Sequence, residues 1–298
     1  MNGGRRGGGG LNALPMSRSA IVAAVMASAG LAVHGGYVLE ARKADPSVKD
    51  LVARTQAYVS NFESRVAYGV FDEDYTQADD AGTSHFQRTM HGELFLTFLP
   101  TDKDWIAVHD VAEVDGQAVP DRESLQALLQ RAPLQSVGRE VAMRNARFNI
   151  GTIARNFNEP TLALLVLEPA RAFAFSFSLD RVEDDGTGVK VATLRFSEKG
   201  DTPATLIRGP RGEEVQSKGD FLVEVGTGRI RRTHFTLNLP DLSVSLETFY
   251  GYDPHSDLWL PALFQERYER KKNGPHEVIS CEANYTNFRT FDVLGRIK

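Results

Sequence analysis

The chain has 298 residues, of which 42% are hydrophobic and 24% are charged, so its composition is that of a globular protein with a real core. Its formal net charge of -5 disfavours nucleic acid as a partner, because an acidic protein repels phosphates. Cys281 is the single cysteine, which excludes an internal disulfide and a CxxC metal site, and its alternating surroundings predict a half-buried thiol.

The N-terminal stretch has the pattern of a secretory signal peptide. Arg18 precedes a small apolar run over 20–33, and the small residue Gly35 follows it. We expect cleavage after Gly35, with a site near Ala29 as the alternative, because the run is short for a transmembrane helix. An uncleaved membrane anchor is the competing interpretation. The sequence thus predicts a signal peptide over 1–35, a flexible segment over 36–44, a single domain over 45–298, and an extracytoplasmic location, periplasmic or secreted.

The domain is predicted to begin with a helix and then to change to strands. Asp45-Pro46-Ser47 is a helix-start signature, with a polar cap and a proline in the first turn. Apolar residues then recur at helical spacing over 47–63. Segments rich in Val, Phe, Tyr, Thr and Ile follow, and they predict strands over 65–77, 84–99 and 104–114.

A helical insertion is expected near 121–168. Asp121 is the predicted cap of a short helix, and further helical segments are expected over 136–148 and, after Pro160, over 161–167. Strands then resume, and the alternation predicts them over 171–179, 188–197, 203–208, 219–225, 229–239, 241–252, 258–271 and 276–291. The expected class is α+β and mostly β, with about eleven strands in one antiparallel sheet.

Three short segments carry a resemblance to a known family. The strand and turn at 224–230 (EVGTGRI), the turn and strand at 252–261 (YDPHSDLWLP) and the closing segment at 284–289 (NYTNFR) are similar to those of the LolA/LolB-type periplasmic lipoprotein carriers. The chain also resembles uncharacterised secreted acidobacterial proteins, through stretches at 110–116 and 160–165. The resemblance covers roughly residues 45–295 and rests on turn signals rather than on a chemical fingerprint.

The resemblance implies a sheet curved into a half-barrel, with an N-terminal helix and an apolar concave face. A carrier of this type shelters acyl chains, whose exposure to water is unfavourable by ~0.8 kcal/mol per methylene. The side chains that could form such a ligand-binding face are Leu94, Leu96, Phe98, Phe173, Phe175, Phe177 and Leu179. The alternative is an ordinary core that the protein fills with its own helix.

Arginines gather in the predicted helical insertion, which lies near the mouth of a half-barrel. Guanidinium groups could hold the phosphate or carboxylate head group of a lipid, and the candidates are Arg139, Arg144, Arg147 and Arg155. The alternative is the solvent-facing side of an amphipathic helix.

Signals for chemistry are weak in this chain. The sequence lacks the G-x-S-x-G, H-E-x-x-H, P-loop and GxGxxG motifs, so we predict no catalytic residues and no cofactor. His85 and His91 share one predicted strand and His109-Asp110 lies in the next, but the spacing lacks a tight ligand pair and we predict no metal site.

Three functions follow from these patterns. The first is an exported, non-catalytic binding protein for a hydrophobic or acylated ligand, with a lipid or an acylated protein as its partner. The second is an envelope adaptor with a filled core, no ligand and an envelope protein as its partner. The third is a hydrolase, which requires ionisable groups with shifted pKa values to converge in a cleft.

Overall fold

The computed structural model describes residues 46–297, except 82–83, 121, 132, 156–158, 203, 205, 208–213, 273, 275 and 293–295. The predicted signal peptide over 1–35 and flexible segment over 36–44 lie outside the described residues and stay predictions.

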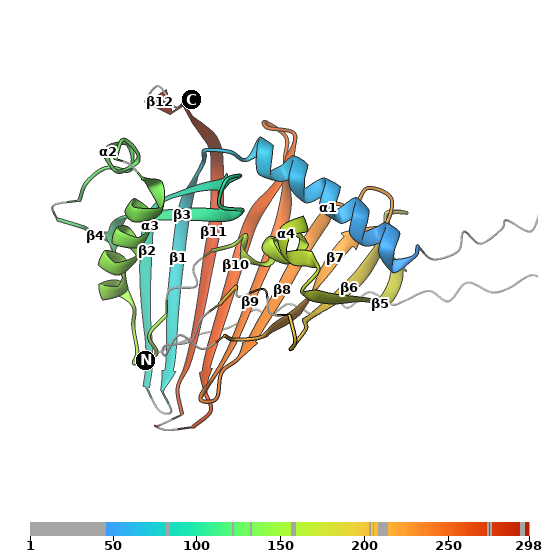
Figure 1. The fold of residues 1–298 in the computed structure, drawn as a ribbon. Coiled ribbons are helices and arrows are strands. Elements are labelled where there is room, and N and C mark those ends of the chain that lie inside the picture. The colour runs from blue at the N-terminus through green and yellow to red at the C-terminus, as the bar shows by residue number, and fades with distance from the viewer. Residues whose placement is uncertain are drawn as a thin grey trace, which may run out of the picture. The chain divides into compact units, whose positions relative to one another are not determined.

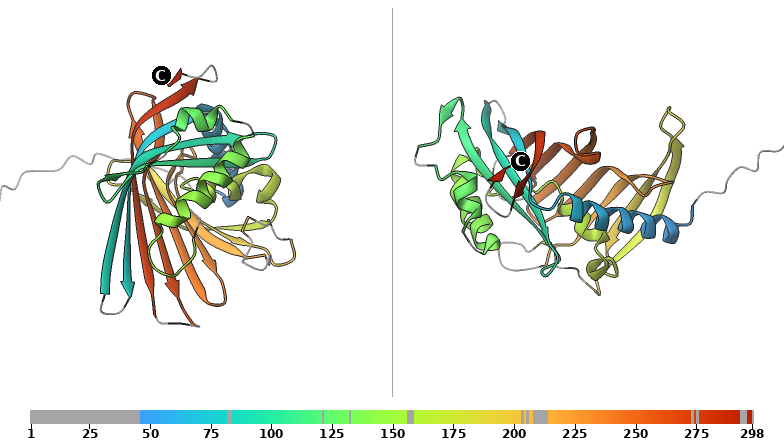
Figure 2. Two further views of the ribbon diagram at one scale, coloured as in Figure 1. Left: turned by 90° about the vertical axis from the view of Figure 1, so that its left-hand side faces the viewer. Right: turned by 90° about the horizontal axis from the view of Figure 1, so that it is seen from above.

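All strands of the described residues belong to one antiparallel sheet (Figure 1). Its strand order is β4-β3-β2-β1-β11-β10-β9-β8-β7-β6-β5, and β12 pairs with the end of β11. The sheet is not closed into a barrel, since β4 with β3 forms one edge and β5 forms the other, and it curves into an open half-barrel (Figure 2). The strands are β1 (Gly69–Ala81), β2 (Ser84–Leu99), β3 (Asp104–Val114), β4 (Gln117–Ala118), β5 (Phe175–Asp184), β6 (Lys190–Glu198), β7 (Ser217–Glu224), β8 (Ile230–Asn238), β9 (Leu242–Asp253), β10 (Leu258–Arg270), β11 (Val278–Asp292) and β12 (Arg296–Ile297).

The helices lie at the start of the domain and between β4 and β5. They are α1 (Val48–Arg65), α2 (Leu125–Leu129), α3 (Leu134–Asn145), the short 3-10 helices η1 (Ala146–Phe148) and η2 (Leu162–Leu167), and α4 (Pro169–Ala172). Within the described ranges, no helix is both long and apolar enough to cross a membrane. Because β4 and β5 lie at opposite edges of the sheet, the segment that connects them runs from one edge to the other.

The centre of the concave face is filled by α1 and η2. Helix α1 presents one buried face, formed by Leu51, Thr55, Val59 and Phe62, because its apolar residues recur at helical spacing. All six residues of η2 are buried. These two elements pack in one core cluster with the inward side chains of the strands.

Helix α3 runs along the free edge of β3 rather than across the sheet (Figure 2). Val137 and Val141 pack with Val108 in a second apolar cluster, on the convex side. The side-chain amide of Asn145 donates a hydrogen bond of 2.6 Å to the backbone carbonyl of His109. An uncovered edge strand can pair with another chain, so α3 protects this edge and also forms a wall beside the concave face.

Several predicted boundaries are corrected. Ser47, rather than Asp45, caps α1: its Oγ accepts the backbone N–H of Asp50 at 3.1 Å. Ser124 caps α2 in the same way, and Asp121 lies outside the described residues. The first strand begins at Gly69 rather than 65, because α1 continues to Arg65.

The strand predicted from 171 begins at Phe175. Pro169 opens α4 instead, and the N–H of Ala174 bonds the carbonyl of Arg171 in the turn that ends it. Phe173 consequently lies outside the strand and is 62% exposed. A strand over 203–208 is absent at the described positions 204, 206 and 207, and the remaining positions lie outside the described residues.

Candidate ligand-binding site

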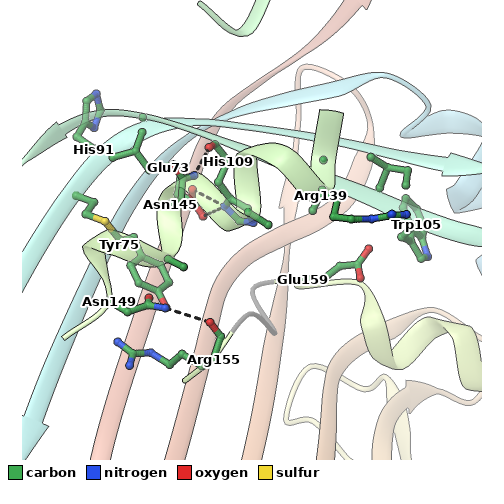
Figure 3. Close-up of a pocket in the computed structure, with 18 of the residues that line it drawn as sticks. Glu73, Tyr75, His91, Trp105, His109, Arg139, Asn145, Asn149, Arg155 and Glu159 are labelled. Carbon is green, nitrogen blue, oxygen red and sulfur yellow. Dashed lines mark hydrogen bonds and ion pairs between the residues drawn. The ribbon is translucent and has the colours of Figure 1, made fainter. Parts of the chain in front are cut away.

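A cavity of about 290 Å³ lies between the concave side of β1–β3 and α3 (Figure 3). The sheet supplies its floor, α3 one wall, and the segment from η1 to η2 another. Apolar side chains form part of the lining, among them Met90, Trp105, Ala107 and Val111. Polar side chains converge on the remainder: Glu73, His109, Arg139, Asn145, Asn149, Arg155 and Glu159.

Glu73 and His109 form a hydrogen-bonded couple across the intervening strand β2. The Nδ1 atom of His109 lies 2.8 Å from Oε2 of Glu73, and both side chains are largely buried. Gly92 pairs with Glu73 in the sheet and leaves no side chain between the two. A Cβ at Gly92 would lie 2.3 Å from the carbonyl oxygen of Asp110, so the bulge here requires glycine.

Glu159 brings a buried carboxyl oxygen to the same cavity. Its Oε1 is buried and has no hydrogen-bond partner within the described residues. Burial raises the pKa of Glu159 to about 8, with the nearby carboxylate of Asp104 adding to the shift and His109 opposing it. At neutral pH Glu159 is therefore mostly a neutral carboxylic acid, which can donate a hydrogen bond.

Trp105 anchors the junction between the cavity and the filled centre. Its ring lies 5.9 Å from that of Phe62 on α1 and 5.4 Å from that of Phe98. The side chain is 3% exposed, and its Nε1 has no hydrogen-bond partner in the described part of the chain. A buried indole N–H usually finds a partner, and this donor belongs to a residue that lines the cavity.

Two of the four predicted arginines line the cavity. Arg155 is 5% exposed and donates from Nη1 to the carbonyl of Ile150 at 2.8 Å, and from Nη2 to Oε1 of Gln77. Arg139 projects from α3 and is exposed. Arg144 does not line the cavity, and Arg147 lies over the ring of Phe148, 4.6 Å from its centroid.

A buried polar network continues from the cavity beneath Tyr75. The Tyr75 hydroxyl donates to Oε1 of Glu266 at 2.7 Å, and the Tyr268 hydroxyl donates to Oε2. Burial raises the pKa of Glu266 to about 6, although these two hydrogen bonds favour its charged form. Beside it, Cys281 is 4% exposed, more buried than predicted, and its pKa is raised to about 12 mainly by burial. A thiol in this state is a poor nucleophile.

The seven side chains of the predicted apolar face do not form one surface in the structure. Leu94, Leu96, Phe98 and Phe175 are 7% exposed or less and belong to the filled core, whereas Phe177 and Leu179 are partly buried against it. Phe173 is separated from them in the turn after α4. A ligand-binding role for these side chains stays a prediction.

The histidines considered for metal binding lie apart from one another. His85 pairs with Asp80 and His91 with Asp74, each at 2.7 Å, while His109 pairs with Glu73. The described residues contain no group of three or more His, Cys, Asp or Glu side chains that could hold a metal ion.

Comparison with known proteins yields structural neighbours alone. No protein-family model matches the chain, and no curated protein matches it. Solved structures that are similar include a DUF1329 family protein from Desulfovibrio piger (14% identity, covering 84% of this chain and 94% of that one, TM-score 0.39). A LolA superfamily protein from Nitrosomonas europaea is 12% identical (83% and 94% covered, TM-score 0.30). An outer-membrane lipoprotein-sorting protein domain from Vibrio parahaemolyticus is also 12% identical (83% and 93% covered, TM-score 0.35).

These neighbours include the superfamily that the sequence resembles. Likeness at such identities and scores carries no argument about function.

Proposed function

We propose that this protein is an exported, non-catalytic binding protein that holds an amphipathic ligand, hydrophobic or acylated, in the cavity between β1–β3 and α3. The observation that carries the proposal is a cavity of about 290 Å³ in which an apolar floor meets convergent polar groups, two of them buried and without a partner among the described residues. Such a combination is typical of small-molecule sites.

The size of the cavity sets the size of the ligand. Small-molecule sites span roughly 300–1,000 Å³, so this one suits a small ligand or the head of a longer one. Its floor meets the filled core at Trp105, which contacts Phe98 from the predicted apolar face and Phe62 from α1. A longer acyl chain would have to displace part of η2 or α1 to reach that face.

Native mass spectrometry of the protein, produced from the full chain in an export-competent host, tests the proposal. We expect a retained mass that extracts into organic solvent, and an N-terminus at Gly36 that reports cleavage after Gly35. A ligand-free mass that stays unchanged after incubation with lipids would contradict ligand binding. A retained N-terminus would contradict cleavage but would leave the binding site untouched.

A second candidate function is an envelope adaptor without a ligand. The filled centre of the concave face favours it, because α1 and η2 occupy the place where a carrier would hold acyl chains. An unchanged ligand-free mass, together with capture of a specific envelope protein, would favour the adaptor over the binding protein.

A further inference from the structure

Three polar groups meet on one side of the cavity, each without a hydrogen-bond or ion-pair partner within the described residues. They are the indole N–H of Trp105, Oε1 of Glu159 and the guanidinium of Arg139. Figure 3 shows the carboxyl group of Glu159 pointing towards Arg139 and Trp105. Strand β3, helix α3 and the segment before η2 each contribute one of them, so the fold rather than local sequence brings them together.

This set of groups is rich in hydrogen-bond donors. The guanidinium offers a planar fork that matches a carboxylate, the indole offers one N–H, and a protonated Glu159 offers an O–H. We propose that the cavity selects an amphipathic monocarboxylate, whose carboxylate accepts hydrogen bonds from Arg139 and Trp105 beside Glu159 while its apolar tail lies on the floor. This inference rests on the proposed function and names the chemical class of its ligand.

The surrounding charges favour a single negative charge on the ligand. Asp104 and His109 of β3 act on Glu159 through their charges, and Glu73, Arg139 and Arg155 line the same cavity. Glu73 is paired with His109, and Arg171 offsets the charge of Asp104. The two arginines of the cavity repel a cation. The carboxylates of Glu73 and Asp104 repel a phosphate dianion more strongly than an anion with one charge.

Binding should be coupled to a proton. Since the pKa of Glu159 is about 8, this group is largely protonated at pH 6 and half ionised near pH 8. An anion bound beside Glu159 raises its pKa further. Binding therefore takes up at most about half a proton per ligand near pH 8, and almost none at pH 6.

The probes are octanoate, octanol and octylamine, which share one tail and differ in the head group. The chain has two tryptophans, so the Trp259→Phe variant makes Trp105 the single fluorescent indole. We expect octanoate to change the Trp105 emission and to bind at least about tenfold more tightly than octanol, because it alone makes charge-assisted hydrogen bonds. Octylamine should bind most weakly.

Variants locate the carboxylate. Arg139→Ala should weaken octanoate binding about tenfold and leave octanol binding unchanged, since one charge-assisted contact is lost. Arg144→Ala is the matched control, because it removes an arginine of the same helix that does not line the cavity. Glu159→Gln should bind octanoate without proton uptake, measured by calorimetry at pH 8 in two buffers of different ionisation enthalpy.

The outcomes separate the two proposals. Equal affinity for octanoate and octanol, tighter binding of octylamine, or an unchanged octanoate affinity in Arg139→Ala would overturn the carboxylate inference and leave the binding protein standing. Failure of all three probes to bind the wild-type chain would remove the cavity as a binding site and the proposed function with it.

Discussion

The concave side of one continuous sheet has two regions that differ in what covers them. At the centre, α1 and η2 lie directly on the strands, and the side chains between them form a closed apolar cluster. At the β1–β3 end, α3 stands at the sheet edge instead, and a cavity with polar walls remains. Both regions use strands with the same alternation, so alternation determines which face is apolar but not whether the chain fills it.

The two regions differ in the space beside their polar groups. Among the described residues, Glu73, His109 and Glu159 converge where packing leaves a cavity, whereas the centre next to η2 is lined mostly by apolar side chains. The centre also buries polar atoms without a hydrogen-bond partner among the described residues, such as Oγ1 of Thr161 and Oε1 of Glu63, and such burial is unfavourable. The open end differs because a ligand has room there to supply the missing partners.

The largest effect is expected from breaking the filled centre. Phe62→Ala should lower the free energy of unfolding by about 3–5 kcal/mol, because a 2% exposed ring between Trp105 and Tyr250 is lost and leaves a cavity. Urea unfolding measures this change. Met143→Ala on α3 is the control: the side chain is 68% exposed, and we expect a change within about 0.5 kcal/mol. Equal effects would mean that α1 is not part of the core.

The next effect is a loss of stability as the pH rises. Burial raises the pKa of Glu159 to about 8, of Glu63 to about 7 and of Glu266 to about 6. The folded protein keeps these protons where the unfolded chain has released them, so stability falls from about pH 5 to pH 8. At about 1.4 kcal/mol per pKa unit, and reduced by partial solvent exposure, Glu159 should account for roughly 1–3 kcal/mol.

Comparing the pH dependence of unfolding in wild type and Glu159→Gln checks this prediction. The variant should show a shallower decline, which does not vanish because Glu63 and Glu266 remain. Identical slopes would show that Glu159 is not held protonated in the folded protein.

Much of the sheet could be predicted because its signals are local. The strands over Ser84–Leu99 and Asp104–Val114 have the predicted bounds, since alternation and flanking turn residues define them. Alternation predicted a strand through Phe173, and this prediction is wrong. Pro169 opens the short helix α4, whose turn takes the backbone hydrogen bonds of these residues, so the strand begins at Phe175. The hydrogen bonds of a neighbouring turn thus outweigh the alternation of apolar residues in deciding where the strand begins.

The site could be predicted only in fragments. The arginine cluster predicted from the sequence contains Arg139 and Arg155, which line the cavity. It also contains Arg144 and Arg147, which do not, and nothing in the sequence distinguishes the two pairs. The sequence does not predict that Glu73, Trp105 and Glu159 line one cavity, because this depends on how β1, β3 and the helical insertion pack together. The glycine at position 92, opposite Glu73 in the sheet, is a hint that can be interpreted only once the strand register is known.

An effect of similar size is expected where the β7–β8 turn meets α1. Gly228 has a φ of +75°, and an added Cβ would lie 2.5 Å from the backbone of Arg54. Gly228→Ala should lower the free energy of unfolding by about 1–3 kcal/mol, through backbone strain and displacement of α1 from the filled centre. Gly226→Ala in the same turn meets no atom within 4 Å and should change it by less than about 0.5 kcal/mol. Chemical denaturation of both variants tests the difference.

A pair of equal substitutions compares the two regions most directly. Ala192→Met adds volume to a fully buried position of the filled centre and should be destabilising by about 1–3 kcal/mol. Ala142→Met adds the same volume beside the cavity, at an exposed helical position where methionine is well tolerated, and should change stability by less than about 0.5 kcal/mol. Its thioether chain should instead enter the cavity and weaken octanoate binding. If both substitutions destabilise equally, the β1–β3 end is as closely packed as the centre, and no space for a ligand exists there.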